Sequence, residues 1–345
     1  MASTGGLQVH YLPLAGSEPA RWDGVLGVAT FDRSLGEQDI PIAEVRTPVL
    51  GAKGEVCEVW RTGQATQSGT HGRVRYRHAA GVLFGCITLA EADPSEQQGQ
   101  SCAPEHTALH AATEQGYREI FATLDALGYP YLLRVWNYLP QINLDTHGIE
   151  RYRQFNDARR KALIACGRHV SGNVPAACAL GSANGSPLVI YFLASHEAPT
   201  LIENPRQVSA YEYPAQYGPR PVFSRASVLR ERSGALLFIS GTSSIVGHQT
   251  VHAGDVAAQT RETLTNIEAL LGEANRVTGP SRFDLGNLAY KVYVRKDADL
   301  PSIQSQLHAI LGPGAQVMYL RADICRQDLL VEIEAIGHAP DSAAA

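Results

Sequence analysis

Apolar and polar positions follow the same order twice along this chain of 345 residues. In the C-terminal half, a short apolar run at 235–240 suits a buried strand. A helix follows, in which core-facing positions recur every three or four residues from Val256 to Leu271, and Asp255 is placed to cap it. The pattern then predicts an alternating strand at 288–295, a short helix at 301–311, and strands at 315–320 and 329–336.

The N-terminal half repeats this order. The elements predicted there are a strand, a long helix, a strand, a second helix and two strands, at 81–89, 105–127, 131–138, 150–166, 176–180 and 188–194. Copies this far apart exceed the period of a solenoid repeat and match ordinary domain size. The sequence therefore predicts an α+β fold of two modules, each a mixed β-sheet with two helices packed on one face, and the two sheets packed helix-side out.

Changes in composition suggest where the modules begin and end. Residues 1–203 are expected to form the N-terminal module with an extension, whose two or three short strands include 27–31 and 56–61. Residues 204–225, rich in Pro, Gly and Tyr, form a linker, and 226–338 form the C-terminal module. The small and polar residues at 339–345 predict a disordered tail.

Composition and charge exclude several classes of partner. Hydrophobic residues make up 44% and charged residues 18% of the chain, with a net charge of −5, which disfavours nucleic acid as a partner. The apolar run 187–194 is too short for a membrane span, and the first residues lack the basic and apolar regions of a secretory signal. Six cysteines without CxxC spacing indicate free thiols. We therefore expect a cytoplasmic protein without membrane or nucleic-acid partners.

Three stretches of the second module form a recognisable combination. They are Leu-Phe-Ile-Ser-Gly at 237–241, Gly-Asp at 254–255 with Gln-Thr-Arg-Glu-Thr-Leu at 259–264, and Leu-Val-Glu-Ile-Glu-Ala-Ile at 330–336. With these residues the module resembles the Rid (YjgF/YER057c) family, whose members are trimers with sites between protomers. The resemblance implies that a chain with two linked copies builds such a site internally, as a monomer or a small homo-oligomer.

Five stretches carry a more specific resemblance over nearly the whole chain. They are Arg-Val-Trp-Asn-Tyr-Leu-Pro-Gln-Ile-Asn at 134–143, Glu-Arg-Tyr-Arg-Gln-Phe-Asn at 150–156, Tyr-Gly-Pro-Arg at 217–220 with Ser-Arg-Ala at 224–226, Ser-Gly-Thr-Ser-Ser-Ile-Val-Gly-His at 240–248, and 325–332. Taken in order, they make the chain similar to chorismatases. The resemblance implies that chorismate is the substrate and that pyruvate and 3-hydroxybenzoate are the products.

Chorismate carries two carboxylates, and arginine suits their recognition because its planar fork binds a carboxylate bidentately and stays charged. The motif-bearing stretches supply three arginines for this role, with Arg134 in reserve. Two tyrosines that flank the linker can donate hydroxyls to a carboxylate or a ring oxygen. Surface ion pairs for the arginines and simple packing for the tyrosines are the alternatives. The predicted substrate-binding residues here are Arg153, Arg220, Arg225, Tyr213 and Tyr217.

Cleavage of the enol ether requires a proton on its terminal methylene carbon, and a carboxylic acid whose pKa is raised by burial suits that step. Glu332 and Glu334 alternate with apolar residues, so both face one side of a strand, where a solvated acidic face is the alternative interpretation. The first module carries Ile190 at the position matched to Glu332. The resemblance to Rid proteins implies an acid or base at this glutamate. We predict Glu332 as the general acid of a single site, built by the second module and lined by the first.

The resemblance also bears on the product. Chorismatases that aromatise the ring are expected to carry a cysteine seven positions before the glutamate, where Cys325 stands, although a small buried cysteine is also common at a strand end. Ser243 replaces the alanine or glycine expected in the Ser-Gly-Thr-x-Ser loop, and this departure makes 4-hydroxybenzoate a possible second product. Gly241 and its neighbours can offer backbone N–H groups to a carboxylate, although a tight turn also favours glycine.

Other chemistries have weaker support. His106, His110 and Glu114 share a helical face but lack a fourth metal ligand, and no nucleotide-binding or serine-hydrolase motif is present. We therefore expect no metal and no cofactor. Gln316 and Val317 stand where Rid deaminases place a carboxylate-binding arginine, which disfavours that activity. Three alternatives stay open: an imine or enamine deaminase, a chorismate hydrolase that stops at trans-dihydroxycyclohexadienoate, and a ligand-binding module without turnover.

Overall fold

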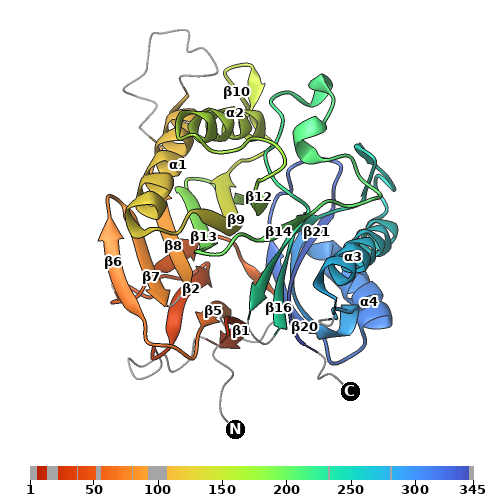
Figure 1. The fold of residues 1–345 in the computed structure, drawn as a ribbon. Coiled ribbons are helices and arrows are strands. Elements are labelled where there is room, and N and C mark those ends of the chain that lie inside the picture. The colour runs from red at the N-terminus through yellow and green to blue at the C-terminus, as the bar shows by residue number, and fades with distance from the viewer. Residues whose placement is uncertain are drawn as a thin grey trace.

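The computed structural model describes residues 6–13, 22–36, 38–51, 56–79, 81–91, 107–231, 234–279 and 282–341. Two large sheets face one another, and each carries two helices on its outer side (Figure 1). A third, smaller sheet closes one end of the space between them, and the core there contains side chains from all three sheets. The predicted α+β fold of two modules packed helix-side out is confirmed.

The first large sheet has the strand order β12-β9-β13-β8-β7-β6. Its strands are β6 (Gln67–His71), β7 (Val74–Ala79), β8 (Val82–Leu89), β9 (Tyr131–Pro140), β12 (Ala176–Ser182) and β13 (Leu188–Ser195). Helices α1 (Ala108–Leu127) and α2 (Arg151–Ala165) cover its outer face. Between them the chain makes the short pair β10 (Asp145–Thr146) and β11 (Ile149–Glu150).

The second large sheet repeats this arrangement. Its order is β14-β15-β16-β21-β19-β20-β4, so that β20-β19-β21-β16 match β12-β9-β13-β8 in order and in parallel or antiparallel direction. The strands are β4 (Val49–Leu50), β14 (Thr200–Ile202), β15 (Ala226–Glu231), β16 (Gly234–Thr242), β19 (Leu288–Val294), β20 (Gln316–Arg321) and β21 (Val331–Pro340). Helices α3 (Val256–Thr278) and α4 (Leu300–Leu311) cover the outer face, and β17 (Ile245–Val246) pairs with β18 (Gln249–Thr250).

The long helices begin where the sequence supplies a cap. The side chain of Asp255 accepts a hydrogen bond from the backbone N–H of Ala258, as predicted, and Thr107 does the same for His110 at the start of α1. Helix α1 ends at Gly128, whose φ of 74° is a left-handed conformation that glycine adopts without strain. No helix within the described ranges is long and apolar enough to cross a membrane.

The N-terminal extension differs from the expectation that it belongs to the first module alone. Strands β1 (Gln8–Pro13), β2 (Val25–Phe31), β3 (Ile42–Val45) and β5 (Val56–Arg61) form a separate sheet of order β1-β5-β2-β3. Strand β4, from the same segment, pairs instead with β20 of the second module. The cause is that β20 would otherwise leave an unpaired edge, which β4 covers.

Two expected boundaries also shift. Strand β14 precedes residue 203, yet it pairs with β15 and belongs to the second sheet. Strand β21 continues through Pro340 and pairs there with Gly234, so residues 339 and 340 are part of the sheet and not of a disordered tail. Residues 342–345 lie outside the described part of the chain.

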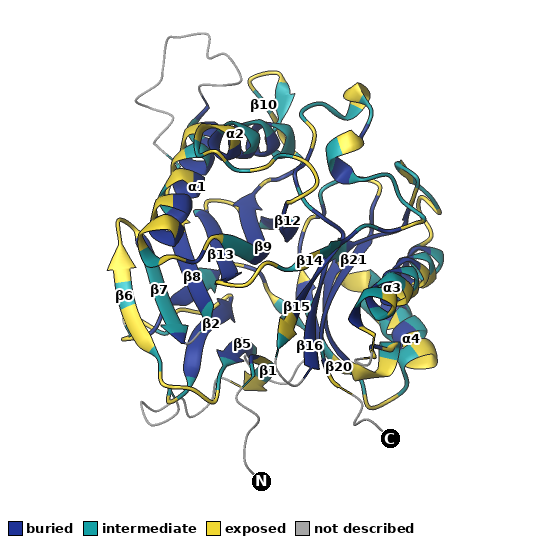
Figure 2. Cartoon of the chain, viewed as in Figure 1, coloured by how far each residue is buried: buried dark blue, intermediate teal, exposed yellow. Residues whose placement is uncertain are grey.

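Most strands of the two large sheets are buried on both faces, because helices cover the outer face and the other sheet covers the inner one (Figure 2). A polar side chain on the inner face is therefore removed from water. Such a group costs free energy unless it is hydrogen-bonded, paired or neutralised. Polar side chains on the inner face are consequently the candidates for a functional site.

Candidate active site

Four segments distant in sequence line a cavity of about 230 Å³. They are the start of α2, the linker, the end of β16 with the loop after it, and β21 with the loop before it (Figure 1). Of the predicted site residues, those that line this cavity are Arg153, Tyr213, Tyr217, Arg225, Gly241, Ser243, Cys325 and Glu332. Arg220 is not among the residues that line it. Its side chain is exposed, and its Nε donates to the carbonyl oxygen of Tyr213 over 3.1 Å.

Glu332 lies on β21 opposite Tyr293 of β19 and is only 4% exposed. Burial raises the pKa of its carboxyl to about 8, and the nearby charge of Glu334 acts in the same direction against the opposing effect of Arg134. A carboxyl with this pKa keeps its proton at neutral pH, which is the state a general acid needs.

Gly241 leaves the space that this carboxyl occupies. A Cβ atom on Gly241 would lie 1.9 Å from Oε1 of Glu332 and 3.1 Å from Cβ of Cys178. The pairing of β16 with β21 shifts register between Ile239 and Thr242, so Gly241 falls at an irregularity of the ladder. Close approach to Glu332 therefore requires glycine here, whereas the role of its backbone N–H toward a carboxylate stays a prediction.

Ser243 contacts the same carboxyl from the loop after β16. Its hydroxyl donates to the carbonyl oxygen of Val331 over 3.1 Å, and its Oγ lies 3.5 Å from Oε2 of Glu332. The hydroxyl also donates toward this carboxyl oxygen, and the contact opposes the rise that burial causes in the pKa of Glu332. Ser243 is thus placed to orient the protonated acid.

Cys325 also lines the cavity, from the loop before β21, and is half-buried. Burial and the nearby Glu332 raise the pKa of its thiol to about 12, so the group is a neutral thiol at neutral pH and a poor nucleophile. The other cysteines in the described residues, Cys57, Cys86, Cys166 and Cys178, are also free, as predicted.

Aromatic and cationic side chains from the linker and from the loop before β21 also line the cavity. The guanidinium of Arg326 lies 4.4 Å from the ring centre of Tyr217 and 5.2 Å from that of Tyr213. Its Nη1 donates to the carbonyl oxygen of His248 over 2.9 Å, while its buried Nη2 has no hydrogen-bond partner in the described structure. Arg225 donates to the Tyr213 hydroxyl over 2.8 Å. Arg326 was not among the predicted site residues, although it directly follows Cys325 in a motif-bearing stretch.

Arg153 stands at the rim of the cavity. Its side chain is 40% exposed, and its Nε lies 3.6 Å from Oε2 of Glu150, three residues earlier on the same helix end. Burial raises the pKa of Glu150, which also lines the cavity. Arg153 is therefore partly neutralised, and Arg326 has the more available N–H donor of the two.

Glu334, the second acidic residue of β21, belongs to a buried ionic network. Its carboxylate lies 2.5 Å from Nη2 of Arg134 and 2.8 Å from Nζ of Lys291, which in turn lies 2.5 Å from Oε2 of Glu58. The Trp136 indole donates to it over 2.8 Å. Although burial alone would raise the pKa of Glu334, Lys291 and Arg134 hold it below its ordinary value. Glu334 therefore stays ionised. Arg134, the reserve candidate, pairs with it, while Nε of Arg134 is buried without a hydrogen-bond partner in the described structure.

The match of Ile190 to Glu332 is wrong by one residue. Ile190 packs in the core under the helices of the first module, whereas Tyr191 packs between the sheets, on the face that Glu332 occupies in β21. A one-residue slip moves every side chain of a strand to its other face, which explains the error. The conclusion drawn from the match is unaffected, because β13 contains no acidic residue.

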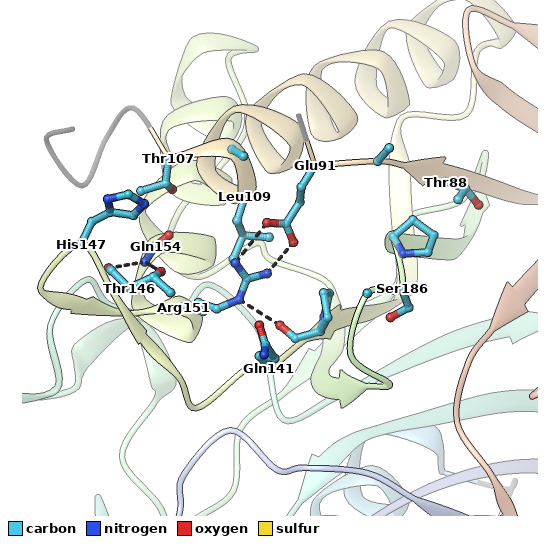
Figure 3. Close-up of a pocket in the computed structure, with 15 residues that line it drawn as sticks. Thr88, Glu91, Thr107, Leu109, Gln141, Thr146, His147, Arg151, Gln154 and Ser186 are labelled. Carbon is cyan, nitrogen blue, oxygen red and sulfur yellow. Dashed lines mark hydrogen bonds and ion pairs between the residues drawn. The ribbon is translucent and has the colours of Figure 1, made fainter. Parts of the chain in front are cut away.

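A larger open cavity, of about 980 Å³, lies on the other side of α2 (Figure 3). Arg151 is the guanidinium that lines it, and both of its terminal nitrogens pair with Glu91. Gln154 donates to the Thr146 backbone and hydroxyl. With its charge neutralised, this cavity offers less for anion recognition than the cavity at Glu332, despite its size.

The helical face considered for a metal is only partly within the described residues, since His106 lies outside them. Nε2 of His110 lies 3.0 Å from Oδ2 of Asp157, and Glu114 pairs with Arg118. Across the described ranges, no group of three or more His, Cys, Asp or Glu side chains is arranged to hold a metal ion.

Comparison with known proteins decides the family. A 3-hydroxybenzoate synthase of Streptomyces hygroscopicus is 36% identical over 291 residues, which cover 81% of this chain and 80% of the relative. A chorismatase of Streptomyces rapamycinicus is 37% identical over 327 residues, or 90% of this chain and 92% of the relative. This chain belongs to the chorismatase family.

One solved structure and one family description agree with this assignment. The crystal structure of a chorismatase aligns with a TM-score of 0.84 at 33% identity, over 98% of this chain and 100% of that one. Residues 58–194 match the family described as chorismatase FkbO/Hyg5-like, N-terminal. A Mycobacterium tuberculosis member of the YjgF/YER057c/UK114 family aligns over 41% of this chain at 25% identity, with a TM-score of 0.29.

Proposed function

We propose that this chorismatase cleaves the enolpyruvyl group from chorismate and releases pyruvate and 3-hydroxybenzoate. The observation that carries the proposal is a buried carboxylic acid, Glu332, whose raised pKa keeps it protonated in a cavity walled by arginine and tyrosine. The names of the curated relatives, 3-hydroxybenzoate synthase and chorismatase, support the same substrate and product.

Cleavage begins with the transfer of a proton from Glu332 to the terminal methylene carbon, which becomes a methyl group. The resulting oxocarbenium ion takes up water at the former enol carbon and becomes a hemiketal. The bond between this carbon and the ring-attached oxygen then breaks, the proton of the hemiketal hydroxyl passes to the ring-attached oxygen, and pyruvate leaves. The proton lost by the added water returns to the Glu332 carboxylate. Ser243 Oγ, 3.5 Å from Glu332, holds the carboxyl in orientation during both transfers.

Aromatisation follows on the ring. The ring now carries two neighbouring hydroxyl groups. Loss of the original one, together with the hydrogen on the carbon that carried the ether oxygen, releases one water and gives 3-hydroxybenzoate. One water is consumed and one released, so chorismate equals the sum of pyruvate and hydroxybenzoate, and no oxidant is required. We assign this step to the part of the cavity beside Cys325, whose neutral thiol supplies a weak hydrogen-bond donor at the departing hydroxyl.

A single chain is proposed to contain the whole site. The first module contributes α2 with Tyr152 and Arg153, and the second contributes β16 and β21 with Gly241 and Glu332. Because both modules supply walls of one cavity, assembly into an oligomer is not needed to complete it.

The proposal is tested by incubating the purified protein with chorismate. Pyruvate is followed through lactate dehydrogenase, and ring products are separated by chromatography. Pyruvate with 3-hydroxybenzoate in equal amounts is the expected result. A share of 4-hydroxybenzoate would be attributed to the loop of Ser243 and tested with Ser243→Gly. Pyruvate with only a non-aromatic diol would overturn the role of Cys325, and absence of pyruvate would overturn the assignment of substrate.

A further inference from the structure

Four ionisable side chains form a continuous ion network in the core between the three sheets. In order they are Glu58 of β5, Lys291 of β19, Glu334 of β21 and Arg134 of β9, and the N–O distances between successive groups are 2.5, 2.8 and 2.5 Å. Each of the four side chains is at most 1% exposed. Two carboxylates balance two cations, so the network as a whole has no net charge.

Hydrogen bonds from two indoles favour the ionised form of both carboxylates. Trp60 donates to Glu58, and Trp136 donates to Glu334, each over 2.8 Å. An indole N–H only donates, so it favours a carboxylate over a carboxylic acid. Stability alone does not explain such a network, because apolar residues of similar volume would stabilise a core as well or better.

Lys291 links the N-terminal sheet to the catalytic strand. Although burial alone would lower the pKa of its ammonium group, Glu334 and Glu58 raise it above the ordinary value. Lys291 therefore stays charged, and with Arg134 it keeps Glu334 ionised. Glu58 supports the charge of Glu334 indirectly, through Lys291, although Glu58 does not line the catalytic cavity.

Glu332 stands two residues before Glu334 on β21, so both side chains lie on the same face of the strand. Ionisation of Glu332 would place a second anion beside a fixed one in the protein interior. Among the charges that act on Glu332, that of Glu334 has the largest effect, and Arg134 opposes it less strongly. The network therefore presents its negative end to the catalytic acid.

The other groups that face Glu332 do not replace this effect. Arg295 favours the ionised form, but its Nη1 pairs with Asp323 over 2.8 Å. Burial raises the pKa of the tyrosine hydroxyls and cysteine thiols around Glu332, so they are neutral near neutral pH. These neutral groups are Tyr152 of α2, Tyr293 of β19, Cys178 of β12 and Cys325. The other charged or acidic side chains that line the same space are Glu150, Arg153, Arg159 and Arg326.

From this arrangement we infer that Glu334 is a positioning residue for the proposed reaction, because its fixed negative charge keeps Glu332 in the protonated form that donates to the substrate. Lys291 and Glu58 are positioning residues one and two steps further away, since they hold that charge in place. The N-terminal sheet thereby takes part in catalysis without contacting the substrate. This inference rests on the proposed function.

The pH profile of kcat/KM with chorismate tests the role of Glu334, because it reports the protonation of the free enzyme's catalytic acid. Glu334→Gln gives the network a net positive charge, which favours ionisation of Glu332. The pH at which kcat/KM is halved should therefore move down by about one unit or more. Activity lost near neutral pH should return as the pH is lowered. A merely structural role would lower kcat/KM at every pH and leave the midpoint in place.

Two further variants separate charge from packing. Glu58→Gln also leaves the network with one positive charge too many, so the midpoint should move in the same direction but less far. Adding Lys291→Met to it removes the excess charge, and the double variant should recover the wild-type midpoint although it has lost more contacts. Glu273→Gln, which breaks an exposed pair with Arg276 on α3, is the matched control and should change nothing.

Two results would overturn the inference. One is an unchanged midpoint in Glu334→Gln. The other is a double variant whose midpoint is shifted as far as that of Glu58→Gln, since packing and not charge would then be responsible. If Glu334→Gln does not fold, Glu58→Gln and the double variant decide the question by themselves.

A titration without substrate distinguishes failure of the inference from failure of the proposed function. Infrared difference spectra follow the carbonyl stretch of protonated Glu332, which is identified by its absence in Glu332→Gln. If chorismate is not cleaved but this band titrates at lower pH in Glu334→Gln, the proposed reaction is wrong and the role of the network holds. If chorismate is cleaved and the band titrates alike in both proteins, the reaction holds and the role of the network is refuted.

Discussion

The two modules share a strand order but carry different residues on their matching inner faces. In the first module, the inward positions of β13 are Val189, Tyr191 and Leu193, and Tyr191 stacks on Trp136 with ring centres 4.6 Å apart. In the second, β21 presents Glu332 and Glu334 inward. The same scaffold thus forms a packing surface in one copy and carries the proposed general acid in the other. The difference teaches that side-chain chemistry, and not topology, separates a supporting module from a catalytic one.

The two modules are joined by the ion pair between Arg134 of the first and Glu334 of the second. Removal of Arg134 should have the largest effect of the changes considered. Arg134→Met leaves the buried carboxylate of Glu334 with Lys291 as its remaining ionic partner. We expect unfolding free energy to fall by about 3–5 kcal/mol, measured by denaturant titration. Arg118→Met, which removes an exposed pair on α1, should change it by less than about 1 kcal/mol. Equal effects of the two variants would contradict a special role for the network.

Glu332→Gln tests the catalytic half of the comparison. Loss of the proton donor should lower kcat for pyruvate release by about 10²–10⁴-fold, since general-acid catalysis contributes that much. Affinity for 3-hydroxybenzoate should persist, because the arginines and tyrosines are intact. Glu268→Gln, on the exposed side of α3, is the matched control and should leave kcat unchanged. Near-full turnover by Glu332→Gln would eliminate the mechanism.

Gly241→Ala tests the space that β16 leaves for the acid. The added Cβ meets Glu332 Oε1, so the carboxyl must move, and a displacement of this kind costs about 10²-fold in kcat. Gly272→Ala is the control, because no atom lies within 4 Å of the added Cβ on α3. That substitution should stabilise the helix by about 1 kcal/mol and spare activity. A fully active Gly241→Ala would show that the carboxyl is not confined as described.

The pH dependence gives the smallest and most diagnostic effect. Since Glu332 must be protonated, kcat/KM should be constant below its pKa of about 8 and fall about tenfold per pH unit above it. Burial and Glu334 raise this pKa, whereas Arg134, Ser243 and Arg295 lower it.

Stability depends on the same titration. The folded pKa of Glu332 lies above the unfolded one, so the protonated acid's contribution to stability is complete below pH 4.5 and is lost as the pH rises toward 8. Glu332→Gln should therefore gain stability over the wild type across that interval; a constant difference would contradict burial as the cause.

The order of elements and most of the cavity could be predicted because each depends on local pattern. Helical and strand periods located α1 to α4 and the sheets, and motifs close to the strand ends carried Glu332, Gly241 and Cys325 to one place. The sequence is less informative where the direction of a side chain or the partner of a strand depends on tertiary contacts. Arg220 lies in irregular backbone, where spacing does not determine which way a side chain points. The pairing of β4 with β20 joins segments that no local signal connects.

The ionic network around Glu334 also could not be predicted from the sequence. Glu58, Arg134, Lys291 and Glu334 come from three sheets and are far apart in sequence, so no spacing rule brings them together. Arg326 lies in a motif-bearing stretch, but the vacant donor at its Nη2 is a property of the folded surroundings. Burial of a charge without a partner is recognised only after every neighbour has been placed.

Because both modules lie in one chain, matching positions of the two modules can change independently. In a symmetric oligomer one codon sets the same position in every subunit, so a residue that suits the reacting group must also be tolerated in every place where it is merely a neighbour. Here Tyr191 and Glu332 occupy related faces of related strands yet are written by separate codons. Selection for a new ring product can therefore change residues of β21 alone, while Tyr191 and its aromatic neighbours in the first module stay the same.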